Sequence, residues 1–163
     1  MRSRKLILTL IISAVVVIAA CIVYSLSPTI RNVSNAPVLV EYLSKPLELK
    51  TTGCIMACEK GQYDLIPNVL VPLNDKIGGK LVADLPLGSV IVIRQFKTYT
   101  NNFGSGFTYL YALGDYKQEN GTMVSFAHNM GVVTKDLYAP ESYPLGLTLW
   151  QDSSMAPIDL YQK

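Results

Sequence analysis

Residues that usually carry catalysis or bind metals are scarce in this sequence. The chain contains one histidine, His128, and three cysteines, Cys21, Cys54 and Cys58. A structural zinc site usually takes four Cys or His ligands, so all four of these residues would be needed, including one inside the first apolar segment. No hydrolase motif surrounds the cysteines. The sequence therefore predicts no metal site, no cofactor and no catalytic residues.

Charged residues are also few, at 16% of the chain. The formal net charge of +2 comes from 14 Lys and Arg against 12 Asp and Glu. Residues 1–24 contain three of the basic residues and no acidic residue, so the remainder has 11 basic and 12 acidic residues and a net charge of −1. A nucleic-acid-binding domain normally presents a basic patch. We therefore exclude nucleic acid as a partner.

One long apolar run stands at the start of the chain. Residues 6–24 carry no charge over nineteen positions, and Arg2, Arg4 and Lys5 precede them. A helix of this length reaches about 29 Å, close to the hydrocarbon thickness of a bilayer. Basic flanking residues stay on the cytoplasmic side, which places the rest of the chain outside. The sequence predicts that residues 1–24 associate with a membrane.

Three interpretations of this segment stay open. A retained anchor agrees with its full apolar length. Ile18-Ala19-Ala20-Cys21 resembles the lipobox of bacterial lipoproteins, in which the cysteine receives the lipid, so Cys21 is a candidate lipidation site. Ordinary signal cleavage after Ala20 is the third interpretation, although Ile22-Val23-Tyr24 continues the apolar run. Residues 25–37 then form a linker, because Pro28 cannot continue a helix.

After Pro37 the pattern becomes that of strands. Residues 89–99 are rich in β-branched and aromatic side chains, and residues 107–113 place large side chains at alternate positions. Shorter strands are expected at residues 38–43, 47–52, 122–127 and 131–135. Asn120-Gly121 predicts a hairpin, and turns are expected at Gly114-Asp115 and at Asn129-Met130-Gly131.

Several short strands without a long amphipathic helix indicate an all-β domain. We expect a small antiparallel barrel or sandwich over residues 38–138. Residues 139–163 contain three prolines and are expected to form an irregular tail that packs on this domain.

Part of the domain resembles bacterial SH3-like domains. In residues 80–93 a strand leads through a Leu-Pro-x-Gly turn into a β-branched strand, and an aromatic strand, the Asn-Gly hairpin and a short last strand follow in the family's order. The resemblance covers residues 67–138. It departs from the family in the longer connection at residues 100–106, and Trp150 lies outside it. The resemblance implies an SH3-like barrel that binds peptide, glycan or protein without chemistry.

Cys54 and Cys58 are four residues apart. If the local chain is a turn, an oxidising compartment would join them in a disulfide, which is the interpretation we favour. On an extended strand their Cα atoms would be about 13 Å apart, too distant for a bridge. Two buried free thiols, or a reactive thiol with His128 as its base, are the alternatives. His128 itself precedes Asn and Met-Gly and is expected in a turn at a strand end.

Tyrosine dominates the aromatic residues, with ten Tyr against four Phe and one Trp. Its flat ring with a polar tip suits a hydrated binding face. The candidate binding residues are Tyr99, Tyr109, Tyr111, Tyr116 and Trp150. Strand periodicity puts Tyr109 and Tyr111 on one face, which is either core or surface. Trp150 either packs on the domain, which we favour, or anchors a partner.

These features predict a membrane-tethered, extracytoplasmic binding module of the bacterial cell envelope. Residues 6–24 would hold it at the inner or outer membrane with the domain in the periplasm, where it would recognise a protein or a cell-wall glycan without catalysis. A periplasmic immunity protein that neutralises a delivered toxin is an alternative. A thiol-dependent envelope enzyme using Cys54 or Cys58 is the third hypothesis.

Overall fold

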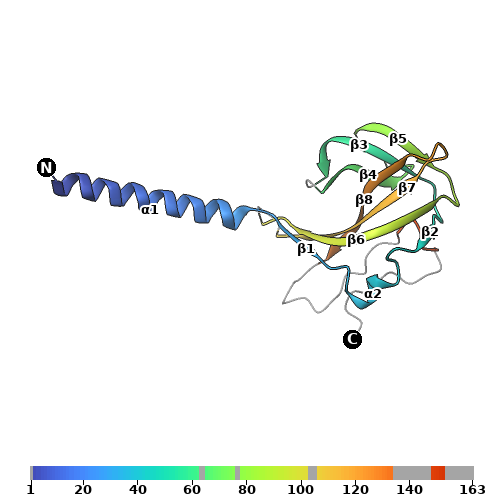
Figure 1. Cartoon of the computed structure of the whole chain (residues 1–163), viewed down its shortest axis with the longest axis horizontal. Helices are drawn as coiled ribbons and strands as arrows, with labels where there is room; N and C mark the ends of the chain where they lie inside the picture. The colour runs from blue at the N-terminus through green and yellow to red at the C-terminus, as the bar shows by residue number, and fades with distance from the viewer. Residues whose placement is uncertain (1, 63–64, 76–77, 103–105, 134–147, 153–163) are drawn as a thin grey trace.

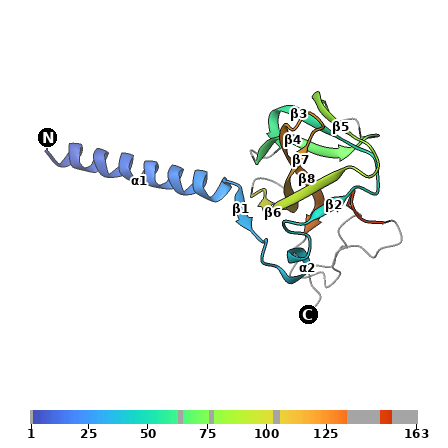
Figure 2. The ribbon, with the colours of Figure 1, turned by 45° about the vertical axis from the view of Figure 1, so that its right-hand side comes forward.

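The computed structural model describes residues 2–62, 65–75, 78–102, 106–133 and 148–152. A long helix projects from a domain that is built mostly of strands (Figures 1 and 2). The elements in chain order are α1 (Arg2–Leu26), β1 (Thr29–Asn32), α2 (Pro37–Val40), β2 (Pro46–Glu48), β3 (Gly53–Gln62), β4 (Ile66–Pro72), β5 (Lys80–Leu85), β6 (Val90–Thr100), β7 (Thr108–Lys117) and β8 (Met123–Val133).

The expected N-terminal helix is present as α1. Its described apolar side chains, from Leu10 to Tyr24, are exposed. Among the residues that the structure describes, no helix is long and apolar enough to cross a membrane. The membrane association of this segment therefore stays a prediction from the sequence.

Eight strands form one sheet. Their order is β1-β6-β7-β8-β4-β3-β5, and β2 pairs additionally with β6. β6, β7 and β8 form an antiparallel meander, whereas β4 pairs with β8 in parallel through Val69 and Ala127. The all-β sheet is therefore antiparallel, as expected, in every described strand pair except β4 with β8. β4 and β8 are distant in sequence, so no hairpin fixes their relative direction.

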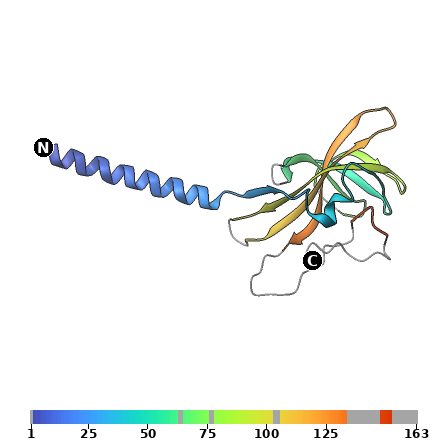
Figure 3. The same cartoon turned by 60° about the horizontal axis from the view of Figure 1, so that its bottom comes forward.

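The segment expected to be a linker contributes a strand. β1 lies within residues 25–37 and pairs antiparallel with β6, from Thr29 opposite Thr100 to Asn32 opposite Lys97. It forms one end of the sheet, directly after α1 (Figure 3). Four residues are too few for side-chain periodicity to predict a strand. The backbone of β1 is hydrogen-bonded through its pairing with β6.

The strand expected at residues 38–43 is also wrong, because this stretch begins with the short helix α2. Pro37 occupies its first turn, where a missing N–H costs no hydrogen bond. Leu39 on this helix is fully buried in the main core. The apolar residues of this stretch therefore reach the core from one turn of helix and not from a strand of the sheet.

β6 matches the predicted strand at residues 89–99. Ile91, Ile93 and Phe96 are fully buried, a spacing of two and then three residues. The register with β7 shifts between Ile93 and Gln95, which makes Arg94 an extra residue on β6. This bulge keeps Phe96 on the core side.

The hairpin predicted at Asn120-Gly121 joins β7 and β8. Gly121 has φ +84° and donates its backbone N–H to the carbonyl of Gln118. The turn expected at Gly114-Asp115 is wrong, because both residues lie inside β7. Residues 122–127 and 131–135 were expected as separate strands, but β8 runs through the first and into the second, with a bulge before Gly131.

Both faces of the meander carry buried side chains. Leu110 and Ala112 of β7 belong to the main core, which also contains residues from α2 and from the segment 148–152. Tyr111 and Leu113, on the opposite face, belong to a smaller cluster with Ala127.

Candidate functional site

A cavity of about 470 Å³ opens at the end of the sheet next to α1. Residues from β1, α2, β6, β7 and β8 line it, together with Asn102 and Gly106 of the connection between β6 and β7. Its volume lies within the range of about 300–1,000 Å³ that is typical of small-ligand sites. We call it the threonine cavity, because it is lined by Thr29, Thr98, Thr100 and Thr108.

The strand register explains why threonines converge there. Thr29 of β1 lies opposite Thr100 of β6, Thr100 lies opposite Thr108 of β7, and Thr108 lies opposite Val133 of β8. Residues that are paired across neighbouring strands point to the same face of a sheet. Three hydroxyl groups and one isopropyl group thus form a single row across four strands. The Oγ1 atoms of Thr100 and Thr108 are 2.9 Å apart and hydrogen-bonded.

Asn102 fixes the edge of this cavity to the start of β1. Its Nδ2 donates to the carbonyl oxygen of Ser27 and to Oγ1 of Thr29, the latter at 3.0 Å. Asn102, just beyond the end of β6, is therefore tied to the residues that follow α1.

Arg31 gives the cavity its charge. It lies opposite Thr98 in the register of β1 and β6, so its guanidinium extends from the same face as the threonine row. It is the one charged residue among the described lining residues. Val33, Ala36, Leu39 and Val133 supply an apolar wall. The arrangement suits a ligand with both a polar, electron-rich group and an aliphatic part.

A second cavity, of about 600 Å³, lies beside β2 and the segment 148–152. Its polar groups are mostly engaged with one another. Glu48 and Lys50 form an ion pair at 3.1 Å, and Oε1 of Gln151 accepts hydrogen bonds from the backbone N–H and the hydroxyl of Thr148. We therefore favour the threonine cavity as the binding site.

The structure separates the tyrosines that the sequence suggested as a binding face. Tyr99, Tyr109 and Tyr111 gather on one face of the meander, whereas Tyr116 packs against the main core. Tyr111 is fully buried, so it cannot contribute to an open binding surface. Tyr99 and Tyr109 lie opposite one another and are half-buried. The four residues thus do not form one recognition surface.

Trp150 and His128 pack together in the interior. Trp150 is 6% exposed, so the interpretation as an accessible partner anchor is wrong and packing on the domain is confirmed. Its ring meets the imidazole of His128 edge to face, with ring centroids 5.4 Å apart. His128 lies inside β8 opposite Ala112, so the expected turn position is wrong.

The surroundings of His128 keep it neutral. Its Nδ1 is 2.9 Å from the carbonyl oxygen of Leu70, and since a carbonyl only accepts, Nδ1 must carry the proton. Burial lowers the pKa of His128, and the hydrogen bond to Leu70 offsets part of that effect. An enclosed ring of this kind is a structural residue and not a general base in contact with solvent.

The disulfide expected between Cys54 and Cys58 is not formed, and Cys21, Cys54 and Cys58 are all free thiols. Cys54 and Cys58 both lie on β3, where four residues of extended chain separate their Cα atoms by about 13 Å. Burial raises the pKa of Cys54, and the nearby carboxylates of Asp84 and Asp75 raise it further. Cys54 therefore stays a protonated thiol at neutral pH, which argues against a nucleophilic role. Lipidation of Cys21, which is exposed on α1, stays a prediction.

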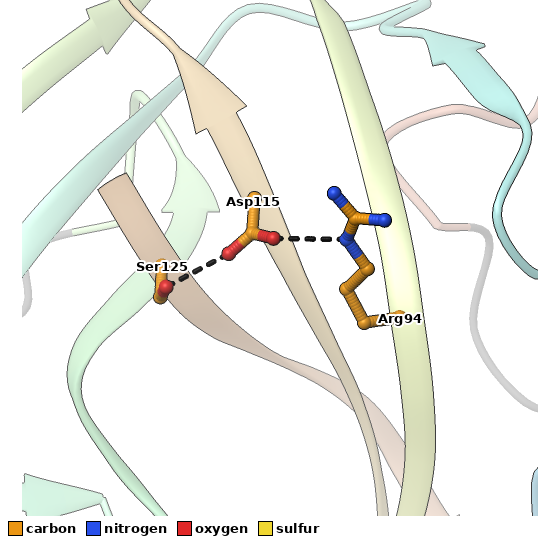
Figure 4. Close-up of polar contacts among 3 residues, drawn as sticks. All are labelled: Arg94, Asp115 and Ser125. Carbon is orange, nitrogen blue, oxygen red and sulfur yellow. Dashed lines mark hydrogen bonds and ion pairs between the residues drawn. The ribbon is translucent and has the colours of Figure 1, made fainter. Parts of the chain in front are cut away.

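A charged network connects neighbouring strands of the meander (Figure 4). Oδ2 of Asp115 accepts a hydrogen bond from Nε of Arg94 at 3.0 Å, and Oδ1 accepts one from the hydroxyl of Ser125 at 2.7 Å. These residues lie on β7, β6 and β8 respectively. The backbone carbonyl of Ser125 also accepts a hydrogen bond from Nδ2 of Asn68 on β4, so this network links four strands.

The Ser125–Asp115 pair is not part of a catalytic triad. Ser125 and His128 are three residues apart on β8, so their side chains point to opposite faces of the strand. His128 is buried against Trp150, whereas Ser125 is exposed. Among the described residues, no group of three His, Cys, Asp or Glu side chains is placed to hold a metal ion.

Comparison with known proteins finds no match to a family model, to a curated protein or to a solved structure.

Proposed function

We propose that this chain is a membrane-tethered, extracytoplasmic binding module of the bacterial cell envelope, and that the threonine cavity is its ligand site. The observation that carries the binding role is the convergence of four threonines, Asn102 and Arg31 around an open cavity with an apolar wall. Specific sites of this kind combine a few placed polar groups with apolar lining. We propose a binding role without catalysis, in which the described lining supplies hydrogen bonds and one fixed positive charge.

The tether is supported by the sequence. Nineteen uncharged residues, 6–24, follow three basic residues, and a polar, Pro-containing segment ends the run. The β domain begins immediately afterwards, with β1. An SH3-like character of this domain is supported by the turn at Gly88, which has φ +86°, and by the meander β6-β7-β8 that follows it.

Fractionation of the full chain tests the tether. We expect it to sediment with envelope membranes and to resist alkaline extraction. The double substitution Val16→Arg and Val17→Arg should release it into the soluble fraction, because a charge at the centre of a bilayer costs about 3 kcal/mol. The double substitution to Leu is the matched control and should stay in the membrane fraction. Recovery of the wild-type chain in the soluble fraction would overturn the tether.

Site-specific photo-crosslinking in the intact envelope tests the cavity. A small diazirine amino acid at Thr98 faces the cavity, and the same residue at Val90 is exposed at the other end of the same strand. We expect a crosslinked product at position 98 only, and its mass identifies a lipid, glycan or protein. A single stoichiometric protein would favour the immunity hypothesis. Equal or absent labelling at both positions would remove the cavity as the binding site.

A further inference from the structure

The polar side chains that line the threonine cavity favour a negatively charged ligand. Arg31 is the one charged residue in the described part of the lining, and none of the described lining residues is a carboxylate. A guanidinium is always protonated and presents several N–H donors, which suits phosphate or carboxylate oxygens. These groups suit a ligand with an anionic group that meets Arg31 and the hydroxyl of Thr98, which lies opposite Arg31 in the register of β1 and β6.

The hydrogen bonds within the threonine row leave hydroxyl protons that can be donated to a ligand. Oγ1 of Thr29 accepts from Asn102, so its own proton is directed elsewhere. In the pair of Thr100 and Thr108, one hydroxyl donates to the other, and the accepting hydroxyl keeps its proton available. Each Thr hydroxyl has one proton and two lone pairs. The cavity therefore offers hydroxyl protons beside a guanidinium, a combination that suits an oxyanion.

The apolar wall of the cavity indicates the chemistry of the remainder of the ligand. Val33, Ala36 and Val133 are half-buried around it, and Leu39 is buried. Contact between aliphatic side chains and an apolar part of the ligand lowers the free energy of binding, because both surfaces are removed from water. A hydrated inorganic ion has no apolar surface to bury in this way. A ligand with an anionic head and an aliphatic part uses both walls.

Position in the chain points to the source of such a molecule. Thr29 follows the end of α1 at Leu26 by three residues, at most about 10 Å of extended chain. With α1 in the bilayer, as proposed above, the cavity lies at the level of the lipid headgroups. We propose that the threonine cavity binds the phosphate-bearing headgroup of an anionic membrane lipid, an inference that rests on the proposed membrane tether.

Native mass spectrometry of the full chain in neutral detergent tests this proposal. We expect phosphatidylglycerol to be retained and phosphatidylcholine, whose phosphate charge is neutralised by choline, to be retained about tenfold less. Arg31→Gln should weaken phosphatidylglycerol binding about tenfold, and Thr98→Val should weaken it by a smaller factor. Arg94→Gln is the matched control, because it removes the same charge outside the cavity and should leave binding unchanged. Unchanged thermal unfolding of Arg31→Gln, an exposed residue, excludes misfolding as the cause.

Three results would overturn the proposal. Equal retention of the two lipids would remove the anion selectivity, and equal loss in Arg31→Gln and Arg94→Gln would place lipid binding outside the cavity. Displacement of the lipid by glycerol 3-phosphate at equal concentration would show that the ligand is a water-soluble phosphate. Detergent-solubilised protein does not depend on the tether for these readouts, so failure here and failure of the fractionation test are distinguishable.

Discussion

Among single residues, His128 shows most directly how burial determines chemistry. Its imidazole is enclosed between the Leu70 carbonyl and the Trp150 ring. Burial disfavours the charged imidazolium, and the resulting pKa lies below the ordinary value of 6.5. Since it is the sole histidine in the chain, any stability change linked to histidine titration belongs to this residue.

We predict that the free energy of unfolding falls as the pH is lowered from about 6.5 toward 5. In the unfolded chain His128 is protonated at the ordinary histidine pKa, whereas in the folded chain it is protonated only at lower pH. The unfolded state therefore binds more protons between these two pKa values, and lowering the pH favours it. The slope from one group cannot exceed about 1.4 kcal/mol per pH unit. Urea unfolding at pH 7.5, 6.5 and 5.5 measures it. His128→Gln should flatten this part of the profile, and an identical slope in the variant would contradict the prediction.

The Arg94–Asp115–Ser125 network illustrates the opposite case, a polar group at the surface. Asp115 has both carboxylate oxygens engaged, by Nε of Arg94 and by the hydroxyl of Ser125. Cross-strand pairs of this kind stabilise strand pairing by a few tenths of a kcal/mol to about 1 kcal/mol. This network therefore stabilises the pairing of β6, β7 and β8.

At the level of secondary structure, the meander requires that the backbone of β6 lie close to Gly114 of β7. A Cβ atom at this position of β7 would lie 2.6 Å from the carbonyl oxygen of Val92 and 2.9 Å from Cζ of Phe126. The first of these neighbours is backbone and cannot move without breaking the pairing of β6 with β7. Glycine is thus required here by space on both sides of the strand.

We predict that Gly114→Ala lowers the free energy of unfolding by about 1–3 kcal/mol, the usual cost of overpacking. Gly78→Ala is the matched control, because a Cβ there meets no atom within 4 Å, and it should change stability by less than about 1 kcal/mol. Thermal and urea unfolding of the two variants provide the comparison. Equal stability of Gly114→Ala and the wild-type chain would show that the packing around β7 is looser than described.

The whole molecule consists of a projecting helix and a β domain with its own core. The main core is built from residues between Leu39 and Trp150, and the described apolar side chains of α1 are exposed. Asn102 contacts the chain at Ser27, just beyond α1. No described side chain of α1 belongs to the main core.

We predict that residues 27–163 fold alone and unfold cooperatively, with a Tm within about 2 °C of that of the full chain in neutral detergent. The truncation keeps Ser27, Thr29 and the whole ladder between β1 and β6. Circular dichroism during heating measures both chains. Loss of the cooperative transition in the shorter chain would show that α1 takes part in the core.

Local sequence features predicted the elements whose signals are contained in a few neighbouring residues. The uncharged run of residues 6–24 predicted α1, the β-branched run predicted β6, and Asn120-Gly121 predicted the hairpin. In each case the signal depends on the length, periodicity or turn preference of adjacent residues. A chain segment carries these properties wherever it is placed.

The tertiary structure decided what those elements bring together. The parallel contact between β4 and β8 encloses His128, and the extended path of β3 separates Cys54 from Cys58. The sequence did not predict the threonine cavity, because Thr29, Thr100 and Thr108 come from three different strands. The one local signal was the alternation of Thr98 and Thr100 within β6. Only the register between β1, β6 and β7 aligns their hydroxyl groups. Register is fixed by burial of the whole sheet, a property that no single segment contains.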